Sequence, residues 1–197
     1  MFRSTKDILK TLDFEKVMYI LSLNEISGNT KIAYRFSKAV GGTSGYSFGR
    51  SQFDVSNNRN AVTFLKNNGF TQSDINRLLR IDKNISDLNT KLASIKDAID
   101  KYDEEHVKSI CTYVANLEGL PPMTEKTFVH LVDYHNQFNL SRNGKMHTFL
   151  KNNPNYLLSF EVYEFKIENT KWGRENPRDV KRRYKTIERY YDEKEEK

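Results

Sequence analysis

Glycine and proline are scarce and unevenly placed in this chain of 197 residues, and their placement limits the folds it can adopt. There are four prolines and nine glycines, and six of the glycines lie between Gly28 and Gly69. Because these residues interrupt regular structure, most of the irregular backbone is expected there. Elsewhere apolar residues recur at helical spacing, which predicts a mainly α fold with one small β-hairpin element near the N-terminal third.

The composition indicates one domain spanning residues 1–197. Hydrophobic residues make up 37% of the chain, and a chain of this length buries roughly 70% of its unfolded surface. No apolar run approaches 18 residues, so no membrane span is expected. The first residues turn polar at once, without a signal-peptide core, which predicts synthesis in the cytoplasm and export, if any, by another route. Cys111, the single cysteine, is expected to be a buried small hydrophobe.

Apolar periodicity predicts the positions of the helices. The expected helices cover about residues 6–25, 59–67, 75–117, 124–138 and 177–195, the third range holding two or three helices with a break near 101–105. Residues 41–54 alternate Gly, Ser and Thr with aromatic residues, which indicates a short hairpin or looped ribbon. In the 75–117 range a coiled-coil dimer is the alternative to packing within the domain. Packing is favoured because the apolar steps keep no single heptad register.

Chain breaks and caps support these helix boundaries. Gly69 is placed to close the helix before it, and Thr71 followed by Asp74 predicts a capping box. Thr124 is expected to cap the helix that it precedes, and Pro177 suits the first turn of the last helix.

Two segments carry the residues from which chemistry is expected. In the first, Glu25 ends an apolar helix just before Gly28. A carboxyl group partly buried at such a helix end can hold a proton near neutral pH, as glycosidic bond cleavage requires of its acid. In the second, the ribbon of residues 44–54, glycines permit close backbone approach and polar side chains offer hydrogen bonds to a sugar. The expected substrate-binding residues of the ribbon are Ser44, Tyr46, Ser47 and Gln52.

These two segments resemble the lysozyme superfamily, particularly goose-type lysozymes and soluble lytic transglycosylases. Those families place a catalytic Glu, often followed by Ser, at a helix end, and Glu25 with Ser27 one position displaced is similar. They then carry a hairpin of the form Gly-x-Gly-Leu-Met-Gln-Val-Asp, and Gly49, Gln52 and Asp54 fall on the matching positions. The resemblance implies a lysozyme-like fold and cleavage of the β-1,4 bond between N-acetylmuramic acid and N-acetylglucosamine.

Two later segments agree with this resemblance in order. Residues 132–138 are similar to the helix of lytic transglycosylases that brings a Tyr and an Asn to the cleft, which implies substrate contacts from Tyr134 or Asn136. Two positions apart on a helix, these side chains diverge by about 200°, and Tyr134 is the expected cleft residue. Trp172 with Arg182 and Arg183 resembles the last helix of phage-type lysozymes, where such residues are structural.

The chain also departs from the family pattern. Residues 28–51 contain no Asp or Glu, so Asp54 is the one acid of the hairpin. Asp54 either activates water in an inverting hydrolysis, with the carboxyl groups about 6.5–9.5 Å apart, or caps the turn after it. In the second case Glu25 works alone, as in a lytic transglycosylase, where it also deprotonates the sugar's own hydroxyl. Hydrolase and transglycosylase both remain open.

No cofactor or metal is expected, because the four histidines have no metal-binding spacing. The net charge of +6 admits a rival interpretation, a non-enzymatic basic helical protein that binds nucleic acid. The last helix is expected instead to be solvated and amphipathic, packing through Val180, Tyr184 and Ile187. An inactive lysozyme-like binding module is a further alternative.

The leading hypothesis is a peptidoglycan-degrading glycosidase that acts on glycan strands at the periplasm or cell wall, after lysis or injection. Its expected partners are those strands and, as a candidate, an immunity or inhibitor protein; nucleic acid is disfavoured. Chitosan is a less favoured substrate. Residues 28–51 hold Lys31, Arg35, Lys38 and Arg50, which suits approach to an anionic wall polymer.

Overall fold

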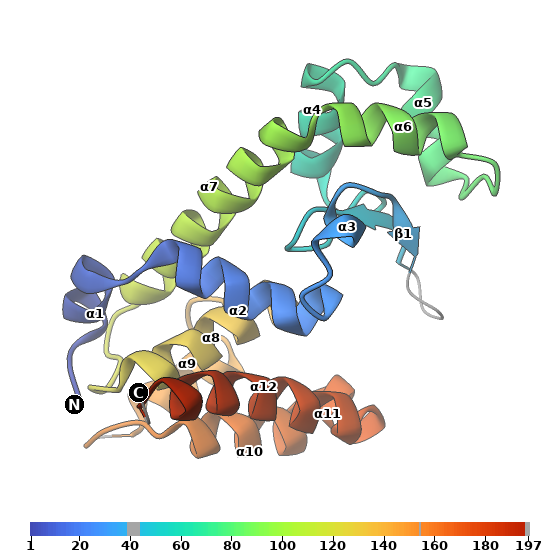
Figure 1. The fold of residues 1–197 in the computed structure, drawn as a ribbon. Coiled ribbons are helices and arrows are strands. Elements are labelled where there is room, and N and C mark those ends of the chain that lie inside the picture. Colours follow the sequence, from blue (N-terminus) through green and yellow to red (C-terminus); the bar gives the residue numbers. More distant parts are fainter. Residues whose placement is uncertain (39–43, 154, 196–197) are drawn as a thin grey trace. The chain divides into compact units, whose positions relative to one another are not determined.

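The protein was analysed as a computed structural model, which describes residues 1–38, 44–153 and 155–195 (Figure 1). Helices make up 66% of the structure, with twelve helices and one small three-stranded antiparallel sheet in the described residues. The predicted mainly α fold with a small β element is therefore confirmed. No helix of the described residues combines the length and apolar character needed to cross a bilayer.

The chain forms two compact units. Unit 1 comprises Met1–Ile20 and His106–Lys197, and unit 2 comprises Leu21–Glu105. Two helices run from one unit into the other: α2 (Phe14–Ile26) and α7 (Lys96–Ala115).

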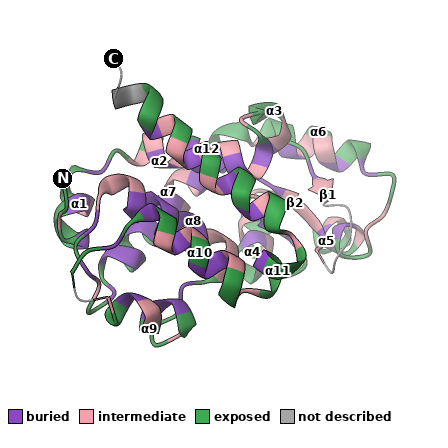
Figure 2. Ribbon diagram, turned by 90° about the horizontal axis from the view of Figure 1, so that it is seen from below, coloured by how far each residue is buried: buried purple, intermediate pink, exposed green. Residues whose placement is uncertain are grey.

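Unit 1 is built from helices around the buried helix α8. Besides its parts of α2 and α7, its helices are α1 (Thr5–Thr11), α8 (Glu125–Phe138), α9 (Lys145–Lys151), α10 (Ser159–Asn169), α11 (Lys171–Glu175) and α12 (Pro177–Glu195). Helix α8 is buried along most of its first two turns (Figure 2), and α10 and α12 both pack against it. The Thr124 hydroxyl accepts a hydrogen bond from the Thr127 amide, which confirms the expected cap, and Pro177 begins α12 as expected.

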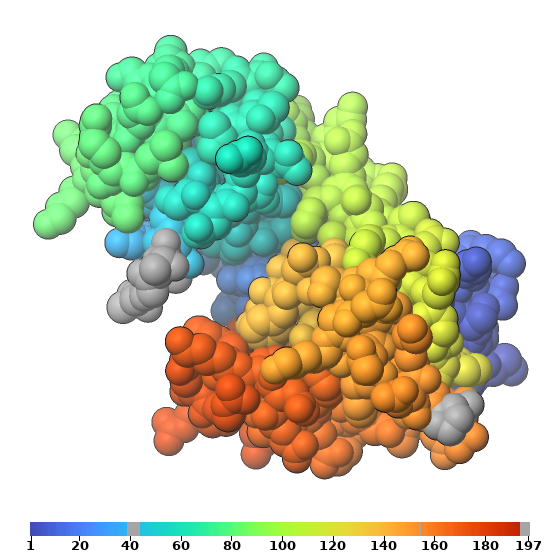
Figure 3. Space-filling view, turned by 180° about the vertical axis from the view of Figure 1, so that it is seen from behind, coloured from blue at the N-terminus to red at the C-terminus, as the bar shows by residue number. Residues whose placement is uncertain are grey.

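Unit 2 combines the small sheet with short helices. Its elements are α3 (Thr30–Ala33), β1 (Ser37–Lys38), β2 (Tyr46–Phe48), β3 (Phe53–Asp54), α4 (Arg59–Asn67), α5 (Gln72–Leu79) and α6 (Ser86–Ser94), with parts of α2 and α7. The strand order is β1-β2-β3, and Ser47 of β2 pairs with Ser37 on one side and Asp54 on the other. The residues of α4, α5 and α6, teal to green in Figure 3, form one face of this unit.

Aromatic side chains pack together in the core of unit 2. The ring of Phe36 lies edge-on to those of Phe48 and Phe70, with centroids 5.9 Å away in each pair. Such edge-to-face pairs add stability beyond the area that they bury. The sheet is too short to be stable alone, so this cluster and the helices around it hold the hairpin in place.

The prediction of one helix over residues 6–25 was wrong in one respect, because these residues do not form a continuous helix. Leu12 is extended, and α2 starts afresh at Phe14. The carboxylate of Asp13 accepts a hydrogen bond from the Lys16 amide, 3.1 Å away. This is an N-cap contact, which favours a new helix start over continuation of the old one.

The expected break near residues 101–105 was also wrong. Helix α7 is continuous there, and the breaks fall instead at residues 80–85 and at Ile95. Ile81 has a φ of +60°, a conformation that ends a helix. The apolar residues of this region, including Leu78, Leu88 and Ile99, lie in the core of unit 2. The favoured interpretation, packing within the chain's own fold, is therefore confirmed over a coiled-coil seam.

Other local predictions were accurate. Helix α4 spans Arg59–Asn67 as expected, and Gly69 follows it with a φ of +92°. The side chains of Thr71 and Asp74 each bond the other's backbone amide, as a capping box requires. The expected hairpin corresponds to β2 and β3. Its first positions, residues 41–43, lie outside the described residues.

Candidate functional site

Glu25 lies in the last turn of α2 and is half-buried. The helix ends at Ile26, and the next two residues, Ser27 and Gly28, have φ values of +52° and +69°. The amide of Gly28 donates to the carbonyl of Ser22, 3.1 Å away, which satisfies one of the free carbonyl groups at the end of the helix. The chain reverses sharply just after the carboxylate, which fixes Glu25 at a defined helix end.

The β2–β3 hairpin turns tightly at residues 49–52. Gly49 and Gln52 have φ values of +78° and +54°. A Cβ at Gly49 would lie 2.9 Å from the Phe53 ring and 3.1 Å from the Asp103 carboxylate. Glycine is required there both by its conformation and by the close approach of its neighbours. The Gly49 that matches the family hairpin thus has a structural explanation within this chain.

Asp103 of α7 anchors this turn, and sequence reasoning missed it. Its fully buried carboxylate accepts hydrogen bonds from the amides of Arg50 and Ser51, at 2.7 and 2.9 Å. A signal was present in the sequence, because Asp103 lies four residues from both Ile99 and Val107 on the apolar face of the helix. A carboxylate on a buried helix face needs donors, and the hairpin amides supply them.

A second missed cluster joins the hairpin to α7 through Tyr34. Its hydroxyl donates to Asp100 Oδ1, 2.6 Å away, and Arg50 Nη2 lies 3.4 Å from the same oxygen. Burial raises the pKa of Tyr34, and the Asp100 carboxylate raises it further. The Arg50 side chain, which stands where the family has an apolar residue, is thereby directed to α7.

Asp54 has local hydrogen-bond partners on both oxygens. Oδ1 accepts from the amides of Gly45 and Ser56, at 3.2 and 2.8 Å, and Oδ2 accepts from Asn57 Nδ2 at 2.7 Å. These contacts hold the chain as it leaves the hairpin. They favour the turn-capping role among the two that the sequence left open.

The other hairpin residues expected to bind substrate, Ser44, Tyr46, Ser47 and Gln52, are all half-buried. Gln52 donates from Nε2 to the Gly49 carbonyl and accepts from the Ser37 hydroxyl, so its amide braces the turn. Tyr46 lines a groove of about 660 Å³ in unit 2, together with Tyr34 and residues 83–86 before and at the start of α6.

Comparisons of the chain with known protein families, with curated protein sequences and with solved structures found no match. The lysozyme resemblance therefore rests on the residue patterns of the chain itself.

Tyr134 and Asn136 both belong to unit 1, whereas Glu25 and the hairpin belong to unit 2. Tyr134 is buried and packs against the rings of Phe138 and Phe165, and this burial raises its pKa. Asn136 Oδ1 lies 2.9 Å from His106 Nε2, within hydrogen-bond distance. Both side chains therefore have structural partners within unit 1.

The last helix, α12, packs on the rest of unit 1 as expected. Val180 and Ile187 are buried and Tyr184 is half-buried, which confirms the amphipathic interpretation. Arg183 is only 3% exposed and pairs with the buried Asp133, so it is withdrawn from any phosphate on the surface.

The surroundings of Cys111 and His130 indicate structural roles for both side chains. Cys111 is buried, as expected, and burial raises its pKa to about 12, so the thiol stays protonated and unreactive. Burial lowers the pKa of His130, which contacts Glu188 at 2.9 Å. In the described parts of the chain, no three His, Cys, Asp or Glu side chains come together as a metal site.

Proposed function

We propose that this protein cleaves the β-1,4 bond of peptidoglycan between N-acetylmuramic acid and N-acetylglucosamine, with Glu25 as the general acid. The observation that carries the proposal is the position of Glu25. It lies half-buried in the last turn of α2, within the same compact unit as a braced antiparallel hairpin. The family motifs require a carboxyl group at a helix end and a hairpin after it, and unit 2 supplies both.

A general acid must donate a proton to the oxygen that leaves the broken bond. A rigid position favours this step because small displacements of a catalytic group reduce the rate strongly. The turn after Ile26 and the Asp103 anchor of the hairpin both supply rigidity.

The contacts of Asp54 favour a mechanism with a single carboxyl group. Three donors already point at its two oxygens, which suits a structural carboxylate better than a base that must accept a proton from water. Glu25 would then protonate the leaving oxygen and afterwards remove the proton of the sugar's own hydroxyl. The expected product carries an anhydro ring, as lytic transglycosylase products do.

The substrate is then the glycan strand of the bacterial wall, reached after lysis or injection. An immunity or inhibitor protein that covers the hairpin of unit 2 is the protein partner that this role implies. A chitosan-type glucan is the second substrate to assay, because it carries the same β-1,4 linkage.

The first prediction concerns the acid itself. Glu25→Gln keeps the shape of the side chain but removes its proton donor, so release of soluble muropeptides from purified sacculi should fall by about 10²–10⁴-fold. Glu15→Gln is the matched control, because Glu15 is an exposed residue of the same helix. It should retain full activity, and both variants should unfold at the wild-type temperature.

Mass spectrometry of the wild-type products distinguishes the two mechanisms, since hydrolysis gives reducing ends and transglycosylation gives anhydro ends. If the Glu25→Gln variant released muropeptides at the wild-type rate, the catalytic role of Glu25 would be contradicted. Tight, salt-sensitive DNA binding by a wild-type protein that does not attack sacculi would favour the nucleic-acid alternative instead.

A further inference from the structure

The groove of unit 2 has the size and lining of a ligand site. Its volume of about 660 Å³ falls within the range of roughly 300–1,000 Å³ that is usual for ligand pockets. Two parts of the chain line it: residues 34–36 with Tyr46, and residues 83–86 with Asn89, Thr90 and Ala93. Amide, hydroxyl and aromatic groups are therefore present together with two cations.

The two cations, Arg35 and Lys83, are available to a ligand. Both are exposed, and neither has an ion-pair partner among the residues that the structure describes. The described lining contains no Asp or Glu, so its formal charge is +2. A groove with only positive charges attracts anions and repels cations.

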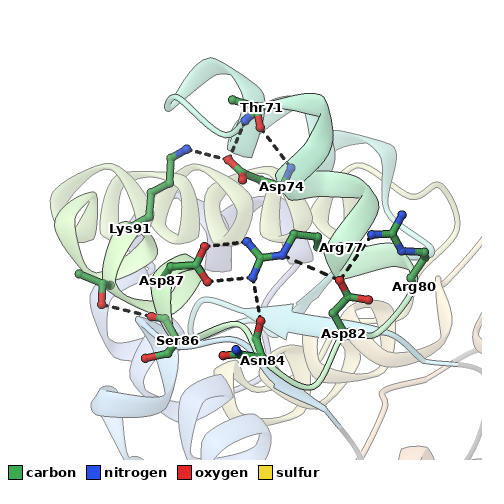
Figure 4. Close-up of polar contacts among 10 residues, drawn as sticks. Thr71, Asp74, Arg77, Arg80, Asp82, Asn84, Ser86, Asp87 and Lys91 are labelled. Atoms are coloured by element: carbon green, nitrogen blue, oxygen red, sulfur yellow. Dashed lines mark hydrogen bonds and ion pairs between the residues drawn. The ribbon is translucent and has the colours of Figure 1, made fainter.

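Two acids close in sequence to Lys83, Asp82 and Asp87, are paired with arginines (Figure 4). One of these arginines is Arg77 of α5. Its guanidinium forms a two-pronged contact with Asp87, at 2.6 and 2.9 Å, and its Nε lies 3.8 Å from Asp82. Arg77 Nη2 also donates to the carbonyl of Asn84, 2.7 Å away. Arg80 Nη2 also lies 3.5 Å from Asp82, so the two arginines together pair with these two carboxylates. The contact of Arg77 with Asn84 holds the backbone next to Lys83.

The tyrosine rings of the groove are held by their hydroxyls. Tyr46 donates to the carbonyl of Asp82 at 2.8 Å, and Tyr34 donates to Asp100. The hydroxyls are occupied by protein acceptors, so the rings offer mainly flat apolar surface. Lys96 Nζ lies 5.2 Å from the centre of the Tyr34 ring and adds a third positive charge nearby.

Amide groups complete the lining. Asn89 Oδ1 accepts from the Phe36 amide at 2.8 Å, which orients the side chain, and its Nδ2 has no partner within the described residues. Flat rings, an amide donor and isolated cations suit a chain of sugars or polyols that bears anionic groups. Two lining cations neutralise few phosphates, so this groove gains little of the counterion release that drives nucleic-acid binding.

We infer that this groove binds an anionic carbohydrate polymer, with Arg35 and Lys83 contacting its carboxylate or phosphate groups. This inference goes beyond the proposed function. The groove would hold the protein on a charged polymer, and that binding does not require Glu25 to cleave a bond. Carboxylate and phosphate groups both offer anionic oxygens to these side chains, so the test must use ligands that carry one group or the other.

The test is isothermal titration of the full-length chain with three oligomers of similar length: oligogalacturonate, poly(glycerol phosphate) and neutral dextran. Wild-type protein should bind at least one charged oligomer and not dextran, with affinity that falls as salt rises. The double variant Arg35→Ser/Lys83→Ser should bind the charged oligomer at least about tenfold more weakly, because it loses two charge-assisted contacts.

The matched control is Arg59→Ser/Lys66→Ser, which removes the same charge from unit 2. Both residues are exposed on α4, outside the described lining of the groove and without ion pairs to described residues. Its affinity should stay within about twofold of wild type, since distant surface charges are screened. Circular dichroism should show that both double variants are folded.

The charged oligomer that binds more tightly identifies the anionic group. Failure of wild-type protein to bind either charged oligomer, equal binding of dextran, or unchanged affinity of the Arg35→Ser/Lys83→Ser variant would overturn the inference. Binding of a single-stranded oligonucleotide in preference to both polymers would also overturn it. This test measures binding and not bond cleavage. Its result therefore stands whether or not the Glu25→Gln variant loses activity on sacculi.

Discussion

The Asp103 carboxylate is fully buried and accepts two backbone amides of the hairpin turn. Each of those amides would otherwise be buried without a partner, which costs about 1–3 kcal/mol. The negative charge also lies near Arg50, whose guanidinium contacts Asp100 on the same helix. One side chain thus joins the element that carries the proposed sugar contacts to the long helix α7.

The second prediction follows from this role. Asp103→Asn replaces one acceptor oxygen with a donor group that faces an amide, so the free energy of unfolding should fall by about 1–3 kcal/mol. Guanidinium denaturation followed by circular dichroism measures the change. Glu105→Gln on the exposed side of the same helix should change it by less than about 0.5 kcal/mol. Equal stability of the Asp103→Asn variant and wild type would show that the turn does not depend on the carboxylate.

Among the helices, boundaries set by local chemistry could be predicted from the sequence. The capping box of Thr71 and Asp74 and the start of α12 at Pro177 depend on residues within one turn of the boundary. Their physical causes are short-range hydrogen bonds and the fixed φ of proline, so a pattern in the sequence is sufficient.

Boundaries that depend on distant residues could not be predicted in this way. The polar run at residues 101–105 resembles a break, but Asp103 is satisfied by amides about 50 positions earlier in the chain. The partners of Asp54 were also invisible in the sequence, although its capping alternative was foreseen. Candidate site residues could be named by type and spacing, whereas the groove arises from segments that meet only on folding.

The third prediction concerns the packing of α8, α10 and α12. Asp133 of α8 lies between Arg183 of α12, at 2.6 Å, and Lys166 of α10, at 3.2 Å, and all three side chains are buried. Burial lowers the pKa of Lys166, while the Asp133 carboxylate opposes that shift. This carboxylate therefore compensates two buried cations.

Asp133→Asn should lower the free energy of unfolding by about 3–5 kcal/mol, because two buried cations lose the carboxylate that both of them contact. Urea denaturation measures this loss. Asp192→Asn removes an exposed carboxylate near Lys126 and should cost less than about 1 kcal/mol. A loss no greater than that of the control would mean that the buried cluster contributes little to the packing of these helices.

Across the whole molecule, the net charge is +6, but some of the cations are buried in ion pairs and others are exposed to a partner. Arg183 and Lys166 neutralise a buried carboxylate and present no charge to a partner. Arg35 and Lys83 have no described ion-pair partner and lie in the groove of unit 2. Arg178, Lys181, Lys185 and Arg189 of α12 are also exposed, so the positive charge available to a polymer is divided between the last helix and the groove of unit 2.

Acid should destabilise the whole protein, because the shifted pKa values of its carboxyl and imidazole groups are all lower in the folded state than in the unfolded chain. Partners lower the pKa values of five described carboxyl groups: Asp7, Asp74, Asp87, Asp179 and Glu188. For Asp179 and Glu188 burial opposes the shift, and hydrogen bonds from neighbouring side chains outweigh it. Burial lowers the pKa values of His130 and His135.

Each of these groups binds protons more readily in the unfolded chain than in the folded one, so stability must fall as pH falls. The loss should begin below about pH 6.5, where unfolded histidine gains its proton, and should steepen below about pH 4.5, where unfolded carboxylates do so. For Glu188, whose folded pKa is about 2, the loss is complete only below that value.

The fourth prediction is therefore a free energy of unfolding that is highest near neutral pH and decreases steadily from pH 6.5 to pH 2. Urea denaturation at a series of pH values measures it. Glu188→Gln removes one of the two described carboxyl groups whose pKa lies near 2, so the variant should be less stable at pH 7 and should lose less stability than wild type between pH 4.5 and pH 2. Parallel pH profiles of the two proteins would show that the His130 and Lys126 contacts of Glu188 do not hold its charge in the folded state.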